Sequence, residues 1–199
     1  MLNTDYNATT RSNQRLDAES RYLLRGFTLV ELLVVITVAG ILMAIAFPGM
    51  RAMVQSQRGA TAAGALVASM SLARSEAIKE DAAAAGVTVC ASTNGTTCDP
   101  GGAWANGWIV LPPPVLGNAP LQVSGALPTD LTVSVQPAIA SLSFLSSGQA
   151  AFAAAFVSFK FCDSRGAAFG RVVEVSRGGR IQAAPRVGQD IAGVALACP

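Results

Sequence analysis

The chain carries one long apolar run near its N-terminus. From Phe27 to Phe47 the sequence reads FTLVELLVVITVAGILMAIAF, and Glu31 is the only charged residue within it. A run of about twenty apolar residues is long enough for a helix to cross a bilayer. Residues 27–47 are therefore predicted to form a transmembrane helix, which also supplies much of the mean hydropathy of +0.45.

A second helical segment is predicted after Pro48–Gly49. We expect this pair to interrupt the helix, because proline removes a backbone hydrogen bond and clashes with the preceding turn. Apolar residues then recur mostly at spacings of three and four, the pattern of a helix with one apolar face. They are Val54, Ala63, Leu66, Val67, Met70, Ala73, Ala77 and Ile78, while Arg51, Gln55, Arg58, Arg74 and Lys79 lie largely off this stripe. This amphipathic stem, residues 48–86, should end near Ala85 with Gly86 as its cap.

Beyond Gly86 the pattern changes to short strand-like segments, separated by turns rich in Gly, Ser and Pro. Several alternate apolar and polar residues, as half-buried strands do. The segments are 87–90, 107–111, 131–135, 142–145, 156–162 and 171–176. Strands without helices between them favour antiparallel pairing. The chain is thus predicted to be α+β, with a long N-terminal helix packed on a small antiparallel β-sheet head, residues 87–199.

Composition argues against an enzyme. The 199 residues include 13% charged side chains, a formal net charge of +2 and no histidine. Without histidine, Ser-His-Asp and Cys-His nucleophiles and most catalytic zinc sites are excluded. Carboxylates such as Asp99, Asp130 and Asp163 are scattered at turns, and no glycine-rich phosphate loop precedes a helix. We expect no catalytic residue, no cofactor and no metal site.

The residues around the apolar run predict its orientation. Arginines precede it at positions 11, 15, 21 and 25. Basic residues beside an apolar span hold that end in the cytoplasm, so the chain after Pro48 should face the periplasm. An ordinary secretory signal is cut after its apolar region at a small-residue site, and Phe47–Arg51 offers no such site. The expected location is the bacterial inner membrane, as a single-pass protein with a periplasmic head.

The junction before the run, Arg25-Gly26-Phe27-Thr28-Leu29-Val30-Glu31, resembles the type III signal of type IV prepilins and type II secretion pseudopilins. The resemblance implies a leader at residues 1–26, cut by a prepilin peptidase between Gly26 and Phe27. It also implies methylation of the new N-terminal Phe27. The partners it implies are that peptidase, membrane lipid, an inner-membrane assembly platform and other minor and major pilins.

Glu31 needs a partner, because an unpaired carboxylate in hydrocarbon costs several kcal/mol. In filaments of the family that the junction resembles, this glutamate is thought to pair with the terminal amine of a neighbouring subunit. Removal of Gly26 would create that amine on Phe27. The alternative is that Glu31 reaches the nearby membrane interface by itself. We favour the assembly role.

The stem and head resemble the minor pilins and pseudopilins grouped as GspH/FimT, most nearly the FimT/FimU-type minor pilins. The resemblance is carried by ALVASMSLARSEAIKE in the stem, and in the head by 87–90, 95–98, 107–110, 144–148 and 172–180. It spans nearly the whole chain after Arg25. The implied segments are a leader at 1–26, a membrane and filament-core helix at 27–47, a stem at 48–86 and a head at 87–199.

Four cysteines in an exported chain indicate disulfides, and four allow three pairings. We favour Cys90–Cys98, which closes a short loop off the first strand. The second bridge would then be Cys162–Cys198, which ties the C-terminal tail to a central strand. The other two pairings stay open.

Arginines gather in the last third of the chain. After Phe156 the basic residues are Lys160, Arg165, Arg171, Arg177, Arg180 and Arg186, against three acidic residues. Such a stripe could bind phosphates, and some FimT-like pilins bind DNA through a Gly-Arg-x-Arg pattern here. In this chain Gln182 replaces the second arginine, so the candidates are Arg177, Arg180 and Arg186. The alternative is a solvated turn that serves solubility or contacts a neighbouring subunit.

These observations favour a minor pilin that takes part in type IV pilus assembly or priming at the filament tip. The first alternative is a type II secretion minor pseudopilin, because it would share every feature from Gly26 to Gly86. The second alternative is a DNA-binding minor pilin for DNA uptake, with DNA as a further partner.

Overall fold

The structure is a computed structural model that describes residues 26–79, 86–114 and 119–198. Its contacts divide the chain into two compact units, one that ends at Ala46 and one that runs from Phe47 to Pro199. Most of the predicted leader, residues 1–25, lies outside the described residues.

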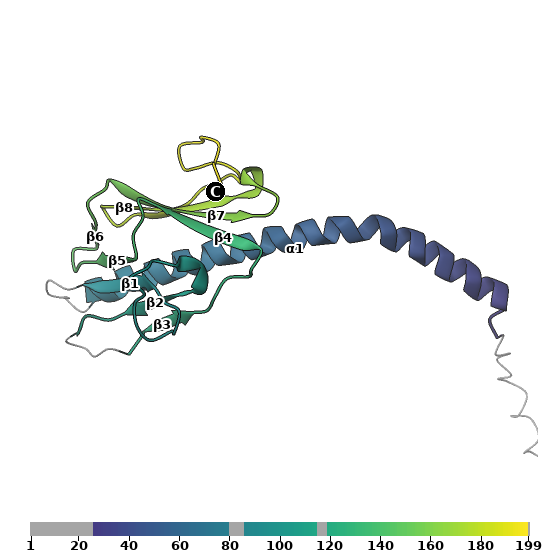
Figure 1. Ribbon diagram of the computed structural model, residues 1–199, viewed down its shortest axis with the longest axis horizontal. Helices are drawn as coiled ribbons and strands as arrows, with labels where there is room; N and C mark the ends of the chain where they lie inside the picture. Colours follow the sequence, from purple (N-terminus) through teal and green to yellow (C-terminus); the bar gives the residue numbers. More distant parts are fainter. Residues whose placement is uncertain (1–25, 80–85, 115–118, 199) are drawn as a thin grey trace, which may run out of the picture. The chain divides into compact units, whose positions relative to one another are not determined.

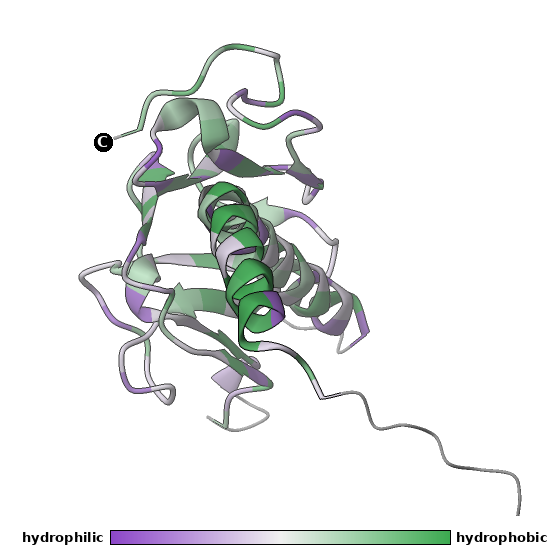
Figure 2. Ribbon diagram, turned by 90° about the vertical axis from the view of Figure 1, so that its right-hand side faces the viewer, coloured by the Kyte–Doolittle hydropathy of each residue, from purple (hydrophilic) through white to green (hydrophobic). Residues whose placement is uncertain are grey.

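In the N-terminal unit, residues 26–28 precede a helix that begins at Leu29. The helix, α1, comprises Leu29–Lys79 and is coloured purple to teal in Figure 1. By length and composition alone it could cross a membrane: its most apolar 18-residue window has a mean hydropathy of 2.7 and is 0% buried. Figure 2 shows this apolar part of the ribbon in green.

The expectation that Pro48–Gly49 interrupts the helix is wrong. Both residues lie within α1, which is a single element of 51 residues. Proline removes only one backbone donor, and a helix continues when the turns on both sides of it are stable. The described helix ends at Lys79, so the predicted end near Ala85 lies outside the described residues.

The second half of α1 packs into the head through the predicted stripe. Leu66, Met70, Ala73 and Ala77 are buried, and the two alanines allow the helix to approach the strands closely. The ends of the stripe differ from the prediction. Val54 and Ile78 remain 45% and 50% exposed, although Ala77 next to Ile78 is fully buried.

The head contains two antiparallel sheets where the sequence analysis expects one. The first sheet has the order β3-β2-β1-β5-β6. Its strands are β1 Val87–Ala91, β2 Trp108–Leu111, β3 Gln122–Ser124, β5 Ser141–Phe144 and β6 Ala150–Ala151. The central strand β1 pairs with β2 through Val89 and Val110, and with β5 through Val89 and Leu142.

The second sheet has the order β4-β7-β8-β9. Its strands are β4 Leu131–Gln136, β7 Phe156–Asp163, β8 Arg171–Ser176 and β9 Ile181–Ala183. The short 3-10 helices Trp104–Asn106 and Ala167–Phe169 connect strands. The six predicted strands correspond to β1, β2, β4, β5, β7 and β8. The three short strands β3, β6 and β9 were not predicted.

One core joins the stem to both sheets. It contains Leu66 and Met70 from α1, Val89 and Phe144 from the first sheet, and Phe159 from the second. The ring of Trp104 meets Phe159 edge to face, with centroids 4.9 Å apart. The stem after Phe47 and the head therefore form one hydrophobic unit, and the fold is α+β as predicted.

Candidate functional site

The predicted processing junction precedes the helix. Gly26 and Phe27 are exposed and non-helical, and Phe27 is 81% exposed. A Cβ built on Gly26 would meet no heavy atom within 4 Å. Within its unit the Gly26–Phe27 bond is thus open to an enzyme that needs an extended, accessible backbone.

Glu31 lies in the first turn of α1. Its backbone N–H donates to Oγ1 of Thr28 at 3.1 Å, which is the bond of an N-capping threonine. The cap satisfies one of the free donors at the helix start, and a carboxylate in the first turn interacts favourably with the helix dipole. Thr28 therefore fixes where the helix begins and places Glu31 one turn from Phe27.

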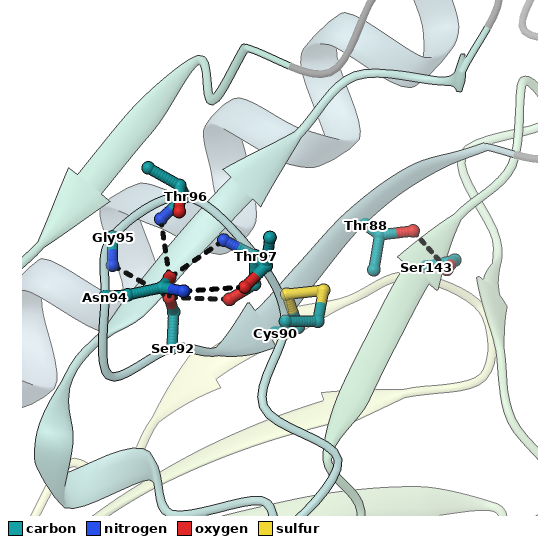
Figure 3. The surroundings of a disulfide bond; sticks show 9 residues. Thr88, Cys90, Ser92, Asn94, Gly95, Thr96, Thr97 and Ser143 are labelled. Carbon is teal, nitrogen blue, oxygen red and sulfur yellow. Dashed lines mark hydrogen bonds between the residues drawn. A yellow bond between two sulfur atoms is a disulfide. The ribbon is translucent and has the colours of Figure 1, made fainter.

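The first disulfide joins Cys90 of β1 to Cys98, with Cα atoms 5.5 Å apart. The loop that it closes is held by its own polar side chains (Figure 3). Oδ1 of Asn94 accepts from the backbone N–H groups of Thr96 and Thr97, both at 2.9 Å. The buried Ser92 hydroxyl donates to the Thr97 carbonyl at 2.7 Å. Such bonds give a turn a defined backbone without regular secondary structure.

The second disulfide joins Cys162 of β7 to Cys198, 36 residues further along the chain. The tail between them is also fixed by backbone bonds, from Gly188 N to Gly170 O and from Leu196 N to Gly188 O. Both bridges have the pairing that the sequence analysis favours. The tail is thus attached covalently to the second sheet.

The three candidate DNA-binding arginines have different surroundings, although all three are exposed. The guanidinium of Arg177 donates to the carbonyl oxygens of Ala153 and Ala154. The guanidinium of Arg180 lies against the side-chain amide of Gln182. When this amide is oriented with its oxygen toward Arg180, the oxygen accepts hydrogen bonds from the guanidinium. Among the described residues, Arg177, Arg180 and Arg186 form no salt bridge.

Other basic residues of the predicted stripe have structural contacts. Nζ of Lys160 donates to Oε1 of Gln136 at 3.0 Å. Arg165 is largely buried and pairs with Asp163 at 2.6 Å, and its other nitrogen donates to the helix at Ala52 O and Ser56 Oγ. Arg165 therefore connects the loop after β7 to the stem and does not contribute to an open phosphate stripe.

The Asp163–Arg165 pair is largely shielded from solvent, since the two side chains are 5% and 16% exposed. Hydrogen bonds from the Arg165 side chain, and then from its backbone N–H, hold the pKa of the Asp163 carboxyl below its ordinary value, against the opposing effect of burial. The guanidinium also lies 4.3 Å from the centre of the Phe169 ring. Asp163 is thus both a turn residue, as predicted, and one half of an ion pair that the sequence did not indicate.

Arg74 was predicted to lie off the apolar stripe, and the structure gives it a defined position. Its Nε donates to the Gly148 carbonyl at 3.0 Å. Gly179 of the β8–β9 turn is buried with φ +78°, and a Cβ there would collide with that carbonyl and come within 3.1 Å of Arg74 Nε. Two glycine-containing turns therefore enclose one face of the Arg74 side chain.

Beside Arg74 lies a groove of about 510 Å³ between the stem and the β8–β9 turn. Its lining residues are Ser71, Arg74, Ser75, Ile78, Gly178, Arg180 and Ile181. Polar and apolar atoms share this lining. We call it the Arg74 groove.

A second hollow, of about 590 Å³, lies between the stem and the end of β3. Met53, Val54, Ala62, Trp108 and Leu127 give it mainly carbon atoms. In the part of the chain that the structure describes, no three His, Cys, Asp or Glu side chains gather as metal ligands.

Comparison with protein families gives two matches. The family described as "Type II transport protein GspH" matches residues 62–179. The "Prokaryotic N-terminal methylation motif" matches residues 25–47, which include Gly26, Phe27 and Glu31. No curated protein sequence gives a significant match.

Two solved structures are similar, both of the type IV minor pilin FimU of Pseudomonas aeruginosa strain PAO1. One is 24% identical, covers 65% of this chain and 90% of its own, and superposes with a TM-score of 0.50. The other crystal form is 25% identical, covers 63% and 91%, and has a TM-score of 0.48. At this identity the first structure shows a shared fold.

The GspH match covers more than half of the chain, and the methylation motif occupies the apolar N-terminus. Such an N-terminus indicates membrane anchoring, and pilins of this kind contact one another in filaments. The chain belongs to the GspH family of minor pilins and pseudopilins, structural subunits rather than enzymes, with a general role in the assembly of a type IV pilus or a type II secretion system.

Proposed function

We propose that the chain is a minor pilin that takes part in type IV pilus assembly or priming at the filament tip. The supporting observation is that the methylation motif and the GspH region occur in one chain, with an exposed Gly26–Phe27 bond before the helix. The minor pilin FimU has a similar fold, which agrees with this proposal.

The proposed path from precursor to filament subunit has three stages. A prepilin peptidase removes residues 1–26, and the Phe27 amine is methylated. Residues 27–47 then hold the mature chain in the inner membrane, with the stem and the head, residues 48–86 and 87–199, in the periplasm. An assembly platform in that membrane finally transfers the subunit from lipid to contacts with other minor and major pilins.

Glu31 supplies the electrostatic reason for this order of events. Because the N-capped first turn keeps Glu31 near the start of the helix, its carboxylate can meet the terminal amine of a neighbour. Before cleavage no amine exists at Phe27, so the pairing cannot form. In apolar surroundings the free-energy cost of burying the carboxylate and the amine as a pair is far smaller than the cost of burying either charge alone.

The test is complementation of a strain that lacks this gene, with surface pili and protein export both measured. The proposal expects the wild-type chain to restore pili and twitching motility. It expects Glu31→Ala to be processed normally and to fail to restore pili, and Thr28→Ser, which keeps the capping hydroxyl, to behave like the wild type. Restoration of export without an effect on pili would overturn it in favour of a type II secretion minor pseudopilin.

A DNA-binding role is the weaker alternative. It would use Arg177, Arg180 and Arg186, and Arg177 already donates to two backbone carbonyls. A mobility shift with the whole chain in detergent tests it across a salt titration. Binding that Arg180→Ala and Arg186→Ala together leave unchanged would exclude these arginines as the DNA contact.

A further inference from the structure

The Arg74 groove contains a cation whose position is set by the fold. Nε of Arg74 is occupied by the Gly148 carbonyl, and the close approach of Gly148 and Gly179 prevents the side chain from moving to that side. A guanidinium has five N–H donors, so one bond leaves four. Among the described residues, Arg74 makes no other hydrogen bond and has no carboxylate within salt-bridge distance.

A second cation and hydroxyl groups line the same groove. Arg180 is in the turn opposite the stem, and its guanidinium lies against the neutral amide of Gln182; among the described residues it has no carboxylate within salt-bridge distance. Ser71 and Ser75 are one helical turn apart on the stem wall. Ser75 uses its hydroxyl hydrogen on the Leu72 carbonyl, so Ser71 is the better placed hydroxyl donor.

We propose that the Arg74 groove is a receptor for a carboxylate of an acidic segment on another filament subunit. Arg74 supplies a fixed guanidinium, Arg180 adds positive charge, and Ser71 offers a hydroxyl. Charge-assisted bonds from arginine to carboxylate are among the strongest polar contacts in proteins, and a guanidinium held in advance loses little entropy on binding. This inference rests on the proposed function, because it takes its partner from the filament.

The size and place of the groove favour a single carboxylate over other anions. A nucleic acid gains its affinity from several phosphates at once, whereas this groove of about 510 Å³ joins two arginines only. Along the helix, residues 47 to 74 are separated by about 40 Å at 1.5 Å per residue, and the proposed partner is therefore a protein segment rather than a lipid headgroup.

The experiment uses the whole chain in detergent micelles, with its arginine side chains labelled for NMR. The probe is an acetylated tetraglutamate peptide, and a tetraglutamine peptide is the uncharged control. The proposal predicts saturable shifts of the Arg74 and Arg180 Nε–H signals with tetraglutamate and none with tetraglutamine. Arg180→Gln should weaken binding about tenfold, the effect of one lost charge-assisted bond.

Arg186→Gln is the matched control, because it removes the same charge from the tail outside the groove, and its affinity should equal that of the wild type. Arg74→Lys keeps the positive charge but replaces the planar guanidinium by an ammonium group, so it should weaken binding. Thermal unfolding should show that the head of this variant remains folded. Equal affinities for Arg180→Gln and Arg186→Gln, or an oligonucleotide that shifts the same signals at lower concentration, would overturn the proposal.

Failure here is distinguishable from failure of the minor pilin function. If the wild-type chain restores pili and tetraglutamate leaves the groove signals unchanged, the receptor is wrong and the pilin function stands. If pili are not restored, the pilin function fails whatever the groove binds.

Discussion

The indole Nε1 of Trp108 donates a 2.9 Å hydrogen bond to the Ser69 hydroxyl, where α1 meets the first sheet. Both residues are buried, and Ser69 in turn donates to Ala65 O at 3.0 Å. A polar pair inside an apolar contact defines the rotation of the helix against the strand, because only one alignment satisfies both groups.

The first prediction concerns this pair. Ser69→Ala leaves the indole N–H buried without an acceptor, so the free energy of unfolding should fall by about 1–3 kcal/mol. Chemical denaturation of the whole chain in detergent measures it. Ser75→Ala removes an exposed hydroxyl from the same helix and should change the free energy of unfolding far less. Equal losses of stability in the two variants would contradict the role of Ser69 as the acceptor that fixes the helix against the strand.

The second prediction compares two adjacent glycines in the β8–β9 turn. Gly179 has φ +78° and no room for a Cβ beside the Gly148 carbonyl, whereas a Cβ at Gly178 would meet only Ser176 Oγ at 3.8 Å. Gly179→Ala should destabilise the head by more than about 2 kcal/mol. Gly178→Ala should stay within about 0.5 kcal/mol of the wild type. Thermal unfolding of both variants checks the difference, and similar melting temperatures would refute it.

The third prediction ranks the two disulfides. In the chain-entropy model, the bridge that spans 36 residues contributes about 3–4 kcal/mol and the bridge that spans 8 residues about 2.5 kcal/mol. Replacement of Cys162 and Cys198 by serine should therefore lower stability more than the same change at Cys90 and Cys98. Denaturation of both double variants gives the order, and the reverse order would contradict this account.

The fourth prediction concerns acid. Since the folded state holds the pKa of Asp163 below its unfolded value of 3.8, it binds fewer protons there than the unfolded chain does. The pair's stabilisation is thus fully present above pH 3.8 and is lost as the pH falls through the folded pKa. Asp163→Asn should lower the free energy of unfolding at neutral pH and make it depend less on pH in the acid range. If the free energies of unfolding of the variant and the wild type fall in parallel with acid, Asp163 is not the group responsible.

The elements with strong local patterns were predictable. The apolar run 27–47 and the six main strands follow from hydrophobic periodicity, which records what each segment buries. The division of the head into two sheets was not predictable, because alternation along one strand does not say which strand pairs with it. Strands β3, β6 and β9 have two or three residues each and carry too little pattern to be detected.

The site residues also differ in how much local pattern they carry. The junction at Gly26 and Phe27 is a local motif, so the sequence alone reveals it. Arg74 and Arg165 have partners more than 70 and 100 residues away along the chain, and a single charged residue on a helix or in a loop gives no sign of such a contact. The adjacent glycines at 178 and 179 were the one available signal, since a left-handed turn position often marks close backbone approach.

We propose that the chain is cut before its apolar helix and is assembled through the residue that the cut exposes. Mass spectrometry of the protein from its native cell identifies its mature N-terminus. The expected result is a chain that begins at Phe27 and carries one added methyl group on its amine. An intact leader, or a chain that begins beyond Phe47, would contradict it.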